Sequence, residues 1–209
     1  MIRALNALRR LRDGNRRFTS ERRTSGEYLN EERRTEIAGN QEPFAIILGC
    51  SDSRVPAELV FDQGLGDLFV IRVAGNIVAP SQIGSIEFAA EKFHTRLVLV
   101  LGHTQCGAIL ATIDELHRPT ENRSRNLASI VDRVRPAVMS LLGGELENDP
   151  PELVRRAGRA NIRASVDALR HGSEILENLV QNNDLLIVGA EYDLETGVVD
   201  FFDGVPDGF

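Results

Sequence analysis

Three apolar runs in the middle of the chain show no alternation between hydrophobic and polar positions. They cover residues 44–49, 68–73 and 97–102, and all three are rich in Val, Ile and Leu. A strand that helices cover on both faces has this composition, because neither of its sides meets water. The three runs therefore predict neighbouring parallel strands in a buried sheet.

Apolar positions recur at helical spacing between and after these runs. Residues 82–94 and 106–116 each carry apolar side chains at intervals of three and four residues, as an amphipathic helix requires. Two later apolar segments, 184–191 and 198–202, are separated by a hairpin-like turn at Glu195-Thr196-Gly197 and predict a fourth strand and an antiparallel edge strand. Alternation of strands and helices predicts an α/β fold with right-handed crossovers.

The remaining segments indicate helices and a loop around this sheet. Residues 126–182 have a mostly helical pattern with breaks at Gly143-Gly144, Pro150-Pro151 and His171-Gly172, and we expect these helices to cover the sheet. The polar segment 117–126 is typical of a surface loop. Near the N-terminus, four apolar residues at helical spacing predict a docked amphipathic helix. They are Ile2, Leu5, Leu8 and Leu11.

The expected fold class is α/β: a central, mostly parallel sheet with four parallel strands and an antiparallel edge strand, flanked by helices and preceded by protruding N-terminal helices. With 209 residues the chain can bury one sizeable core. We expect a single domain over residues 1–209. Its parts are an N-terminal helical arm at 1–40, an α/β core with the candidate site at 41–116, covering helices at 117–182, and C-terminal strands at 183–209.

Charge and hydropathy limit the classes of partner. The formal net charge is −7, although residues 1–40 hold 10 Arg against 6 acidic residues. A basic arm on an acidic body fits packing against that body or a second copy better than nucleic-acid binding, because the whole chain repels phosphate. No run approaches the roughly 18 apolar residues of a membrane span, and the start lacks a secretory signal. We expect a cytoplasmic protein with neither a membrane nor a nucleic-acid partner.

Both cysteines of the chain lie in short polar motifs that directly follow apolar runs. Cys50 follows the first run, and Cys106 follows the third run together with His103. Ligands bind beyond the carboxyl ends of the strands in an open α/β sheet, so the strand ends deliver these residues to one rim. Two thiolates and one imidazole are the protein ligands of a catalytic zinc that keeps its fourth position for water or substrate.

Two further considerations bear on this zinc hypothesis. A helix that begins near Cys106 favours the thiolate form of that residue through its dipole and free amides. Two cysteines are too few for a disulfide framework and fit a reducing compartment. The plain alternative is that Cys50 and Cys106 are small buried hydrophobic residues and His103 is a capping residue.

Asp52 and Arg54 follow Cys50 closely enough for a turn to bring both beside a metal. The carboxylate could fill the fourth ligand position and close the site, or it could pair with the guanidinium and leave the metal open to water. A third interpretation is a surface salt bridge that caps a helix beginning at Pro56. Spacing alone does not decide between these interpretations.

Four motifs occur in order along the chain. They are CSDSRVPAE at 50–58, RVAGN at 72–76, GSIEFA at 84–89 and GHTQCGAI at 102–109. Together they resemble the β-class carbonic anhydrases over nearly the whole chain. The resemblance implies a Zn²⁺ ion held by Cys50, His103 and Cys106, and a catalytic dyad of Asp52 and Arg54. It also implies reversible hydration of carbon dioxide to bicarbonate and a proton, with attack by a zinc-bound hydroxide.

The resemblance further implies a small apolar pocket beside the metal, with some walls contributed by a second subunit. The matching positions are Gln41, Phe69, Ala74, Phe88 and Gly107. Gln41 and the Gly107 amide would donate hydrogen bonds to a substrate oxygen, and the two Phe would exclude bulk water. The implied assembly is a homodimer or a dimer of dimers, whose N-terminal helices reach across to the partner.

Two rival functions remain at this stage. A hydrolase for carbonyl sulfide or carbon disulfide would keep the same zinc ligands and change mainly the pocket. A non-catalytic zinc scaffold or sensor would have Asp52 bound permanently to the metal, although Arg54 would then have no reason to compete for the carboxylate. The sequence favours the lyase, because its pocket positions follow the ordinary pattern.

Overall fold

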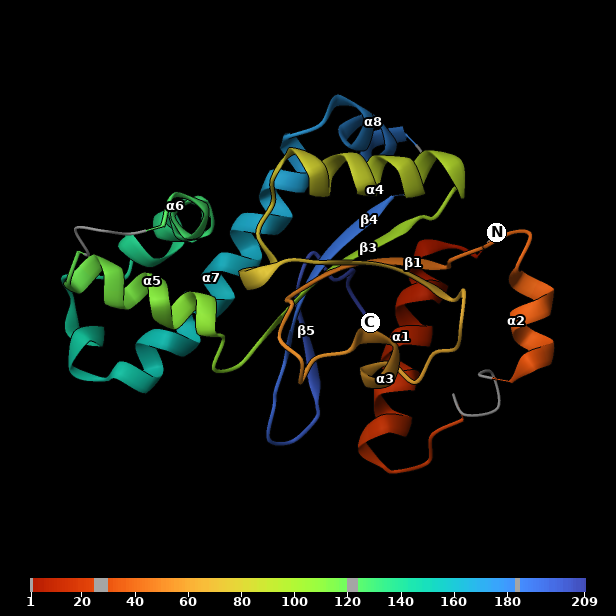
Figure 1. The fold of residues 1–209 in the computed structure, drawn as a ribbon, viewed down its shortest axis with the longest axis horizontal. Helices are drawn as coiled ribbons and strands as arrows, with labels where there is room; N and C mark the ends of the chain where they lie inside the picture. The colour runs from red at the N-terminus through yellow and green to blue at the C-terminus, as the bar shows by residue number, and fades with distance from the viewer. Residues whose placement is uncertain (1, 25–29, 120–123, 183–184) are drawn as a thin grey trace.

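The computed structural model describes residues 2–24, 30–119, 124–182 and 185–209 (Figure 1). Its centre is a five-stranded sheet in the order β2-β1-β3-β4-β5. The strands are β1 (Ala45–Gly49), β2 (Leu68–Arg72), β3 (Leu97–His103), β4 (Leu186–Tyr192) and β5 (Val199–Asp203). The first four strands pair in parallel and β5 is antiparallel to β4, which confirms the predicted sheet. Residue 184, the predicted start of the fourth strand, lies outside the described residues.

Helices surround this sheet. They are α1 (Ala4–Thr19), α2 (Glu31–Ile37), α3 (Ala57–Val60), α4 (Pro80–Lys92), α5 (Gly107–His117), α6 (Arg125–Met139), α7 (Pro150–His171) and α8 (Glu174–Asn182), with short 3₁₀ turns η2 (Ala74–Asn76) and η3 (Glu145–Asn148). The predicted breaks between the later helices are confirmed. Gly143 takes a left-handed conformation after α6, Pro150 begins α7, and Gly172 ends it.

The strands lack alternation because both faces of the sheet are covered. On one face, Ile47 and Leu99 are fully buried against α1 and α3. On the other face, Leu48 and Val100 are fully buried against α4, α7 and α8. Figure 1 shows α1 and α3 on one side of the sheet and α4 and α8 on the other. A third apolar cluster joins α5, α6 and α7 beyond the carboxyl ends of the strands.

The N-terminal helix α1 is docked on its own chain, as its apolar stripe predicted, so the expectation of protruding N-terminal helices is wrong for α1. Its buried face packs on the sheet of its own chain, and a Cβ added at Gly14 would clash with the Phe61 carbonyl oxygen. The side chain of Asn15 donates to the Gly197 carbonyl at 2.9 Å and accepts from the Val199 N–H at 2.9 Å. The helix α2, by contrast, has no buried residue.

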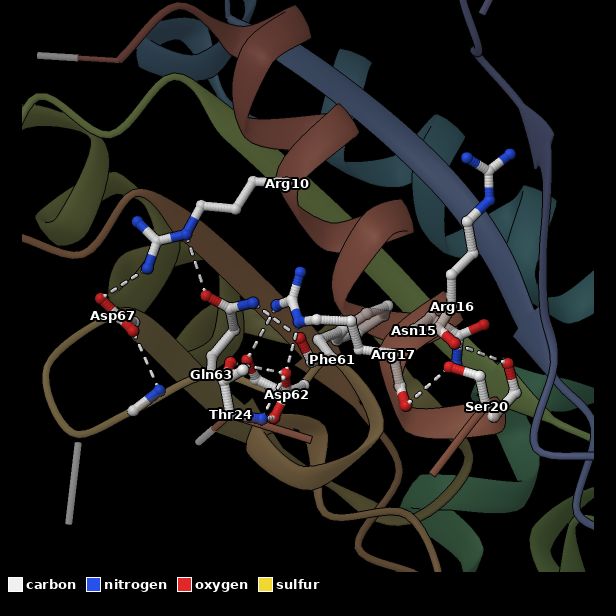
Figure 2. Close-up of polar contacts among 12 residues, drawn as sticks. Arg10, Asn15, Arg16, Arg17, Ser20, Thr24, Phe61, Asp62, Gln63 and Asp67 are labelled. Carbon is white, nitrogen blue, oxygen red and sulfur yellow. Dashed lines mark hydrogen bonds and ion pairs between the residues drawn. The ribbon is translucent and has the colours of Figure 1, made fainter. Parts of the chain in front are cut away.

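A buried carboxylate fixes the segment that follows α1. Figure 2 shows Arg17 and Thr24 converging on Asp62, whose side chain is 0% exposed. The Arg17 Nε–Asp62 Oδ2 distance is 2.6 Å, and the Thr24 backbone N–H donates to Asp62 Oδ1 at 2.9 Å. The amphipathic stripe at the N-terminus predicted that one face of this helix would be buried, but not which surface it would cover.

Two further expectations concern the outer parts of the chain. None of the helices within the described residues is long and apolar enough to cross a membrane. The predicted loop at 117–126 falls partly on residues 120–123, which lie outside the described residues, and α5 and α6 occupy its two ends.

Candidate metal centre

Parallel strand pairing brings the three candidate ligands to one edge of the sheet. Cys50 comes directly after β1, His103 is the last residue of β3, and Cys106 is the N-cap of α5. All three are at least 95% buried. Their ligand atoms lie within 4.8 Å of one another, and this is the one such group that the described part of the chain contains. The expected convergence of these residues is therefore present in the structure.

The histidine ring is oriented for a metal. The His103 Nδ1 lies 2.9 Å from the Thr104 carbonyl oxygen, a contact in which the ring N–H donates. The other ring nitrogen, Nε2, is buried and has no hydrogen-bond partner within the described structure. A metal-binding histidine characteristically donates one nitrogen to a backbone carbonyl and presents the lone pair of the other to the ion. The unpartnered Nε2 therefore fits a role as a metal ligand.

The sulfur atoms are spaced as a shared metal requires. Cys50 Sγ and Cys106 Sγ are 3.9 Å apart, and both cysteines are free. Two sulfurs bound to one tetrahedral zinc would be about 3.8 Å apart, since each Zn–S bond is about 2.3 Å. The donor set and its spacing therefore fit Zn²⁺, with three protein ligands and room for a fourth.

The contact between the two sulfurs shifts the pKa values of the two thiols in opposite directions. The pKa of Cys50 is lowered, chiefly because the Cys106 thiol donates to its sulfur, with further help from His103 and the Gly75 N–H. The pKa of Cys106 is raised by the same contact and by burial. Amides at the start of α5 lower the Cys106 pKa, as expected from the helix dipole, but they are outweighed. Cys50 is therefore the first thiolate of the pair.

The imidazole responds to that thiolate. Burial lowers the pKa of His103, but the nearby Cys50 thiolate and the Asp52 carboxylate outweigh burial and raise it. Both groups are negatively charged, so they attract any positive charge that replaces the proton. The same field that raises the histidine pKa therefore favours a bound cation.

Asp52 and Arg54 form a bidentate ion pair beside this cluster. Arg54 Nε donates to Asp52 Oδ1 at 2.9 Å, and Arg54 Nη2 donates to Oδ2 at 2.7 Å. The Arg54 guanidinium, together with its backbone N–H, holds the pKa of Asp52 far below its usual range, so the carboxylate is ionised throughout the physiological range. Its Oδ2 lies 3.8 Å from His103 Nε2. The carboxylate thus pairs with Arg54 while lying next to the candidate metal ligands.

Arg72 fixes the loop that carries these residues, a role that the sequence did not reveal. Its Nε donates to the Cys50 carbonyl at 3.0 Å, and its Nη2 donates to the Asp52 carbonyl at 2.6 Å. Arg72 ends β2, which is paired with β1 in the register Gly49 to Arg72. Its place in the RVAGN motif was the only signal in the sequence.

The short helix α3 begins at Ala57, with Pro56 at its N-cap instead of its first turn.

The five expected pocket residues do not come together in one chain. Ala74 and Gly107 flank the cluster, because Ala74 precedes the Gly75 N–H that donates to Cys50 Sγ and Gly107 follows Cys106. Gln41 lies before β1, toward the opposite edge of the sheet, on a cavity of about 510 Å³. Phe69 on β2 and Phe88 on α4 are in ring contact at 6.3 Å, and Phe88 is 51% exposed. Within a single chain, only two of the five positions adjoin the ligands.

A separate cavity of about 500 Å³ opens beside His103 and Cys106. Apolar side chains of α5 and α7, among them Ile109 and Val154, form part of its wall. Its rim includes Glu191, whose pKa is raised by burial despite the Arg159 guanidinium 3.2 Å away. Neither Asp52 nor Arg54 lines this cavity, so it approaches the ligands from another side than the ion pair does.

Comparison with known proteins agrees with the geometry. The family model described as carbonic anhydrase matches residues 45–199. The chain is 36% identical to carbonic anhydrase 2 of Mycobacterium tuberculosis, over 91% of this chain and 89% of that protein. It is also 36% identical to the carbonic anhydrase of Mycolicibacterium smegmatis, over 93% and 91% of the two chains.

Solved structures show the same fold. A β-carbonic anhydrase of Aspergillus fumigatus superposes with a TM-score of 0.75 at 25% identity, covering 93% of this chain and 89% of that one. A tetrameric β-carbonic anhydrase of Sordaria macrospora gives a TM-score of 0.74 at 22% identity, over 94% and 97% of the two chains. The second likeness is one of fold alone.

Proposed function

This chain belongs to the carbonic anhydrase family, in its β class, and from that premise we propose that it hydrates carbon dioxide reversibly at a zinc ion held by Cys50, His103 and Cys106. The observation that carries the zinc assignment is the buried, unpartnered Nε2 of His103, which shares a small volume with two free sulfurs. A zinc ion held there supplies Lewis acidity that makes a water molecule nucleophilic near neutral pH.

Asp52 and Arg54 complete this proposal. Because Arg54 keeps the Asp52 carboxylate ionised, Asp52 acts as a hydrogen-bond acceptor that orients the attacking water, and it does not store the product proton. The bidentate contact fixes the direction of the Asp52 carboxylate. Because this carboxylate lies 3.8 Å from His103 Nε2, it would also be near the fourth ligand position of a bound metal. Release from Arg54 would let Asp52 close that position, so the pair also acts as a gate.

The pairing bears on the rival functions. In a permanently closed scaffold, Asp52 would be committed to the metal and Arg54 would be left without its acceptor. The observed ion pair with two short contacts supports the open, catalytic alternative. No feature of the described residues favours carbonyl sulfide or carbon disulfide over carbon dioxide.

We further propose that a second copy of the chain completes the substrate pocket. Gln41, Phe69 and Phe88 adjoin no metal ligand of their own chain, yet Phe69, Phe88 and Phe93 form an aromatic group in which Phe88 is half exposed. Exposed aromatic groups of this kind are typical of interfaces. Pairing of two copies across this group would bring these residues toward a partner site, and the tetrameric relative in Sordaria macrospora agrees with assembly by pairing.

The compartment follows from the same chemistry. Both cysteines are free and serve as ligands, and an oxidising compartment would threaten the 3.9 Å sulfur pair directly. We therefore propose a cytoplasmic location, with neither a nucleic-acid nor a membrane partner.

The proposal is tested by stopped-flow hydration of carbon dioxide with a pH indicator. Three preparations of the same protein are compared: as purified, stripped by a chelator, and restored with one equivalent of zinc. We expect activity to vanish on stripping and to return with zinc, and turnover of carbonyl sulfide to be far slower. Activity that survives complete metal removal, or a preference for carbonyl sulfide, would overturn the proposal.

A further inference from the structure

Two polar residues on α7 lie in an otherwise apolar helix face. Asn161 is 2% exposed and Ser165 is 5% exposed, and they are one helical turn apart. Their neighbours on the same face are fully or almost fully buried hydrophobic residues, among them Ala157, Ile162 and Val166. A buried polar side chain without a partner is unfavourable, so each must be used by the structure.

Both side chains bind the same short turn, η2, far away in sequence. Asn161 Nδ2 donates to the Gly75 carbonyl at 2.8 Å, and Ser165 Oγ donates to the Asn76 carbonyl at 3.0 Å. Gly75 and Asn76 are themselves buried residues and follow the last residues of β2. The contacts therefore hold two consecutive peptide groups of η2 from the side of α7.

The turn needs this support because its backbone is unusual. Gly75 has φ 70° and Asn76 has φ 43°, so two consecutive residues adopt the left-handed conformation. A side chain at position 75 would be strained at this φ, and its Cβ would lie 3.0 Å from Ala108 Cβ. An Asn in this conformation is tolerated but costs free energy that the surrounding contacts must supply.

The turn in its strained shape presents one N–H to the metal site. The Gly75 N–H donates to Cys50 Sγ at 3.3 Å. The N–H and the carbonyl of Gly75 belong to adjacent peptide groups that are joined at its Cα with φ 70° and ψ 17°. Anchoring the carbonyl on α7 therefore restricts the direction of the N–H as long as this backbone conformation is kept. A chain of contacts thus runs from Asn161 through Gly75 to the sulfur of a metal ligand.

We infer that Asn161 and Ser165 are positioning residues for the metal centre, which hold the Gly75 N–H against the Cys50 sulfur. Neither touches the reacting atoms, and both act through η2. The inference rests on the proposed zinc site, because the thiolate that they influence is one of its three ligands. Partners of this kind typically change metal affinity by about 10- to 100-fold when they are removed.

The variants N161A and S165A test this inference, with T95V as a matched control. Thr95 is 3% exposed and donates to the Pro43 carbonyl at 2.8 Å, at the opposite edge of the sheet. Its replacement removes a comparable buried hydrogen bond without touching η2. Each protein is stripped and loaded with Co²⁺, and the thiolate-to-cobalt absorption band is recorded. Zinc affinity is measured by chelator competition without substrate.

We expect the cobalt band of N161A to move to longer wavelength, because a thiolate that loses an N–H donor is more electron-rich. Zinc affinity should fall about tenfold in N161A and less in S165A. In T95V both readouts should equal the wild type, whatever its stability. If N161A does not fold, S165A tests the inference alone: its cobalt band should move to longer wavelength and its zinc affinity should fall.

The outcomes separate this inference from the proposed function. If N161A or S165A folds as judged by circular dichroism and keeps the wild-type cobalt band and zinc affinity, the positioning role is wrong while the zinc site stands. The same conclusion follows if T95V shifts both readouts as much as N161A does. If the wild type binds neither zinc nor cobalt, the proposed function fails first.

Discussion

Arg54 holds the Asp52 carboxylate through two donors, at 2.9 and 2.7 Å, in a position 3.8 Å from His103 Nε2. The pair lies on the loop between β1 and α3, and Arg72 anchors that loop through the Cys50 and Asp52 carbonyls. A carboxylate so close to the metal ligands, yet bound to a guanidinium, separates two tasks. In the proposed function the cysteines and the histidine would hold the metal, and Asp52 would orient the water.

Replacing Asp52 by Asn should impair the reaction and spare the metal. The amide cannot accept a hydrogen bond as strongly as the carboxylate, so we expect kcat/KM for carbon dioxide to fall about a hundredfold. Zinc content should remain one ion per chain, because the three buried ligands are unchanged. Metal analysis and stopped-flow kinetics on the same sample give both numbers.

The matched control for that variant is D167N. The Asp167 side chain is 74% exposed on α7, so its neutralisation should change neither zinc content nor rate. Loss of zinc from D52N would instead identify Asp52 as a ligand that the metal requires.

Replacing Arg72 by Gln should weaken catalysis through the loop. Two carbonyl acceptors lose a charged donor, so the Cys50–Arg54 segment becomes less firmly placed. We expect zinc to be retained and kcat/KM to fall about tenfold, as is usual for an indirect contact. R72K retains a positive charge but lacks the fork of two donors, so it should give an intermediate rate. A wild-type rate in R72Q would show that the loop is held by other contacts.

The sequence predicted the parts of the site that depend on strand ends. Apolar runs without alternation located β1 and β3 to within a residue, and the carboxyl-end rule then brought Cys50 and His103 to one edge. The charge state of the thiols could not be predicted in the same way. It depends on the 3.9 Å contact between Cys50 and Cys106, which the sequence does not encode locally.

Long-range contacts explain the rest of what the sequence did not reveal. Asn161 reaches the Gly75 carbonyl across 86 positions, and helical periodicity gives no sign of that contact. The stripe of apolar residues in α1 predicted burial without naming the surface, which is that of its own chain. The pocket positions Gln41, Phe69 and Phe88 lie away from the candidate ligands of their own chain, and the sequence pattern alone could not show this separation.

Replacing Asp193 by Asn should make folding stability less dependent on pH. The pKa of Asp193 is lowered, chiefly by the Thr196 N–H at 2.7 Å, in the turn between β4 and β5. A carboxyl whose pKa is depressed on folding stabilises the protein above its unfolded pKa, near 3.9, and loses this contribution as the pH falls. Because the carboxylate is largely solvated and its charge is screened, we expect D193N to lower the free energy of unfolding by only about 0.5 kcal/mol at pH 7, and by less near pH 3.

Urea unfolding at the two pH values measures this difference. D207N is the control, since Asp207 lies on an exposed terminal segment, and its effect should be small at both pH values. If D193N lowers the free energy of unfolding as much at pH 3 as at pH 7, the ionised Asp193 carboxylate does not stabilise this turn.

Replacing Phe88 by Glu should disrupt assembly more than folding. The ring is 51% exposed and contacts Phe93 at a centroid distance of 5.5 Å, so its loss removes little buried core within one chain. A buried charge at an interface is strongly unfavourable, and we expect F88E to shift the protein to monomers with reduced activity. Sedimentation velocity of wild type and variant at equal concentration reports the assembly. A wild type that is monomeric and fully active would rule out the shared pocket.

Zinc K-edge X-ray absorption of the purified protein tests the central assignment most directly. If Cys50, His103 and Cys106 hold the metal, the spectrum should fit two sulfur atoms at about 2.3 Å and nitrogen or oxygen ligands at about 2.0–2.1 Å, with one zinc per chain. The C106S variant should lose one sulfur from the fit or lose the metal. A stoichiometric zinc site without sulfur ligands, or a fully active protein without zinc, would contradict the account.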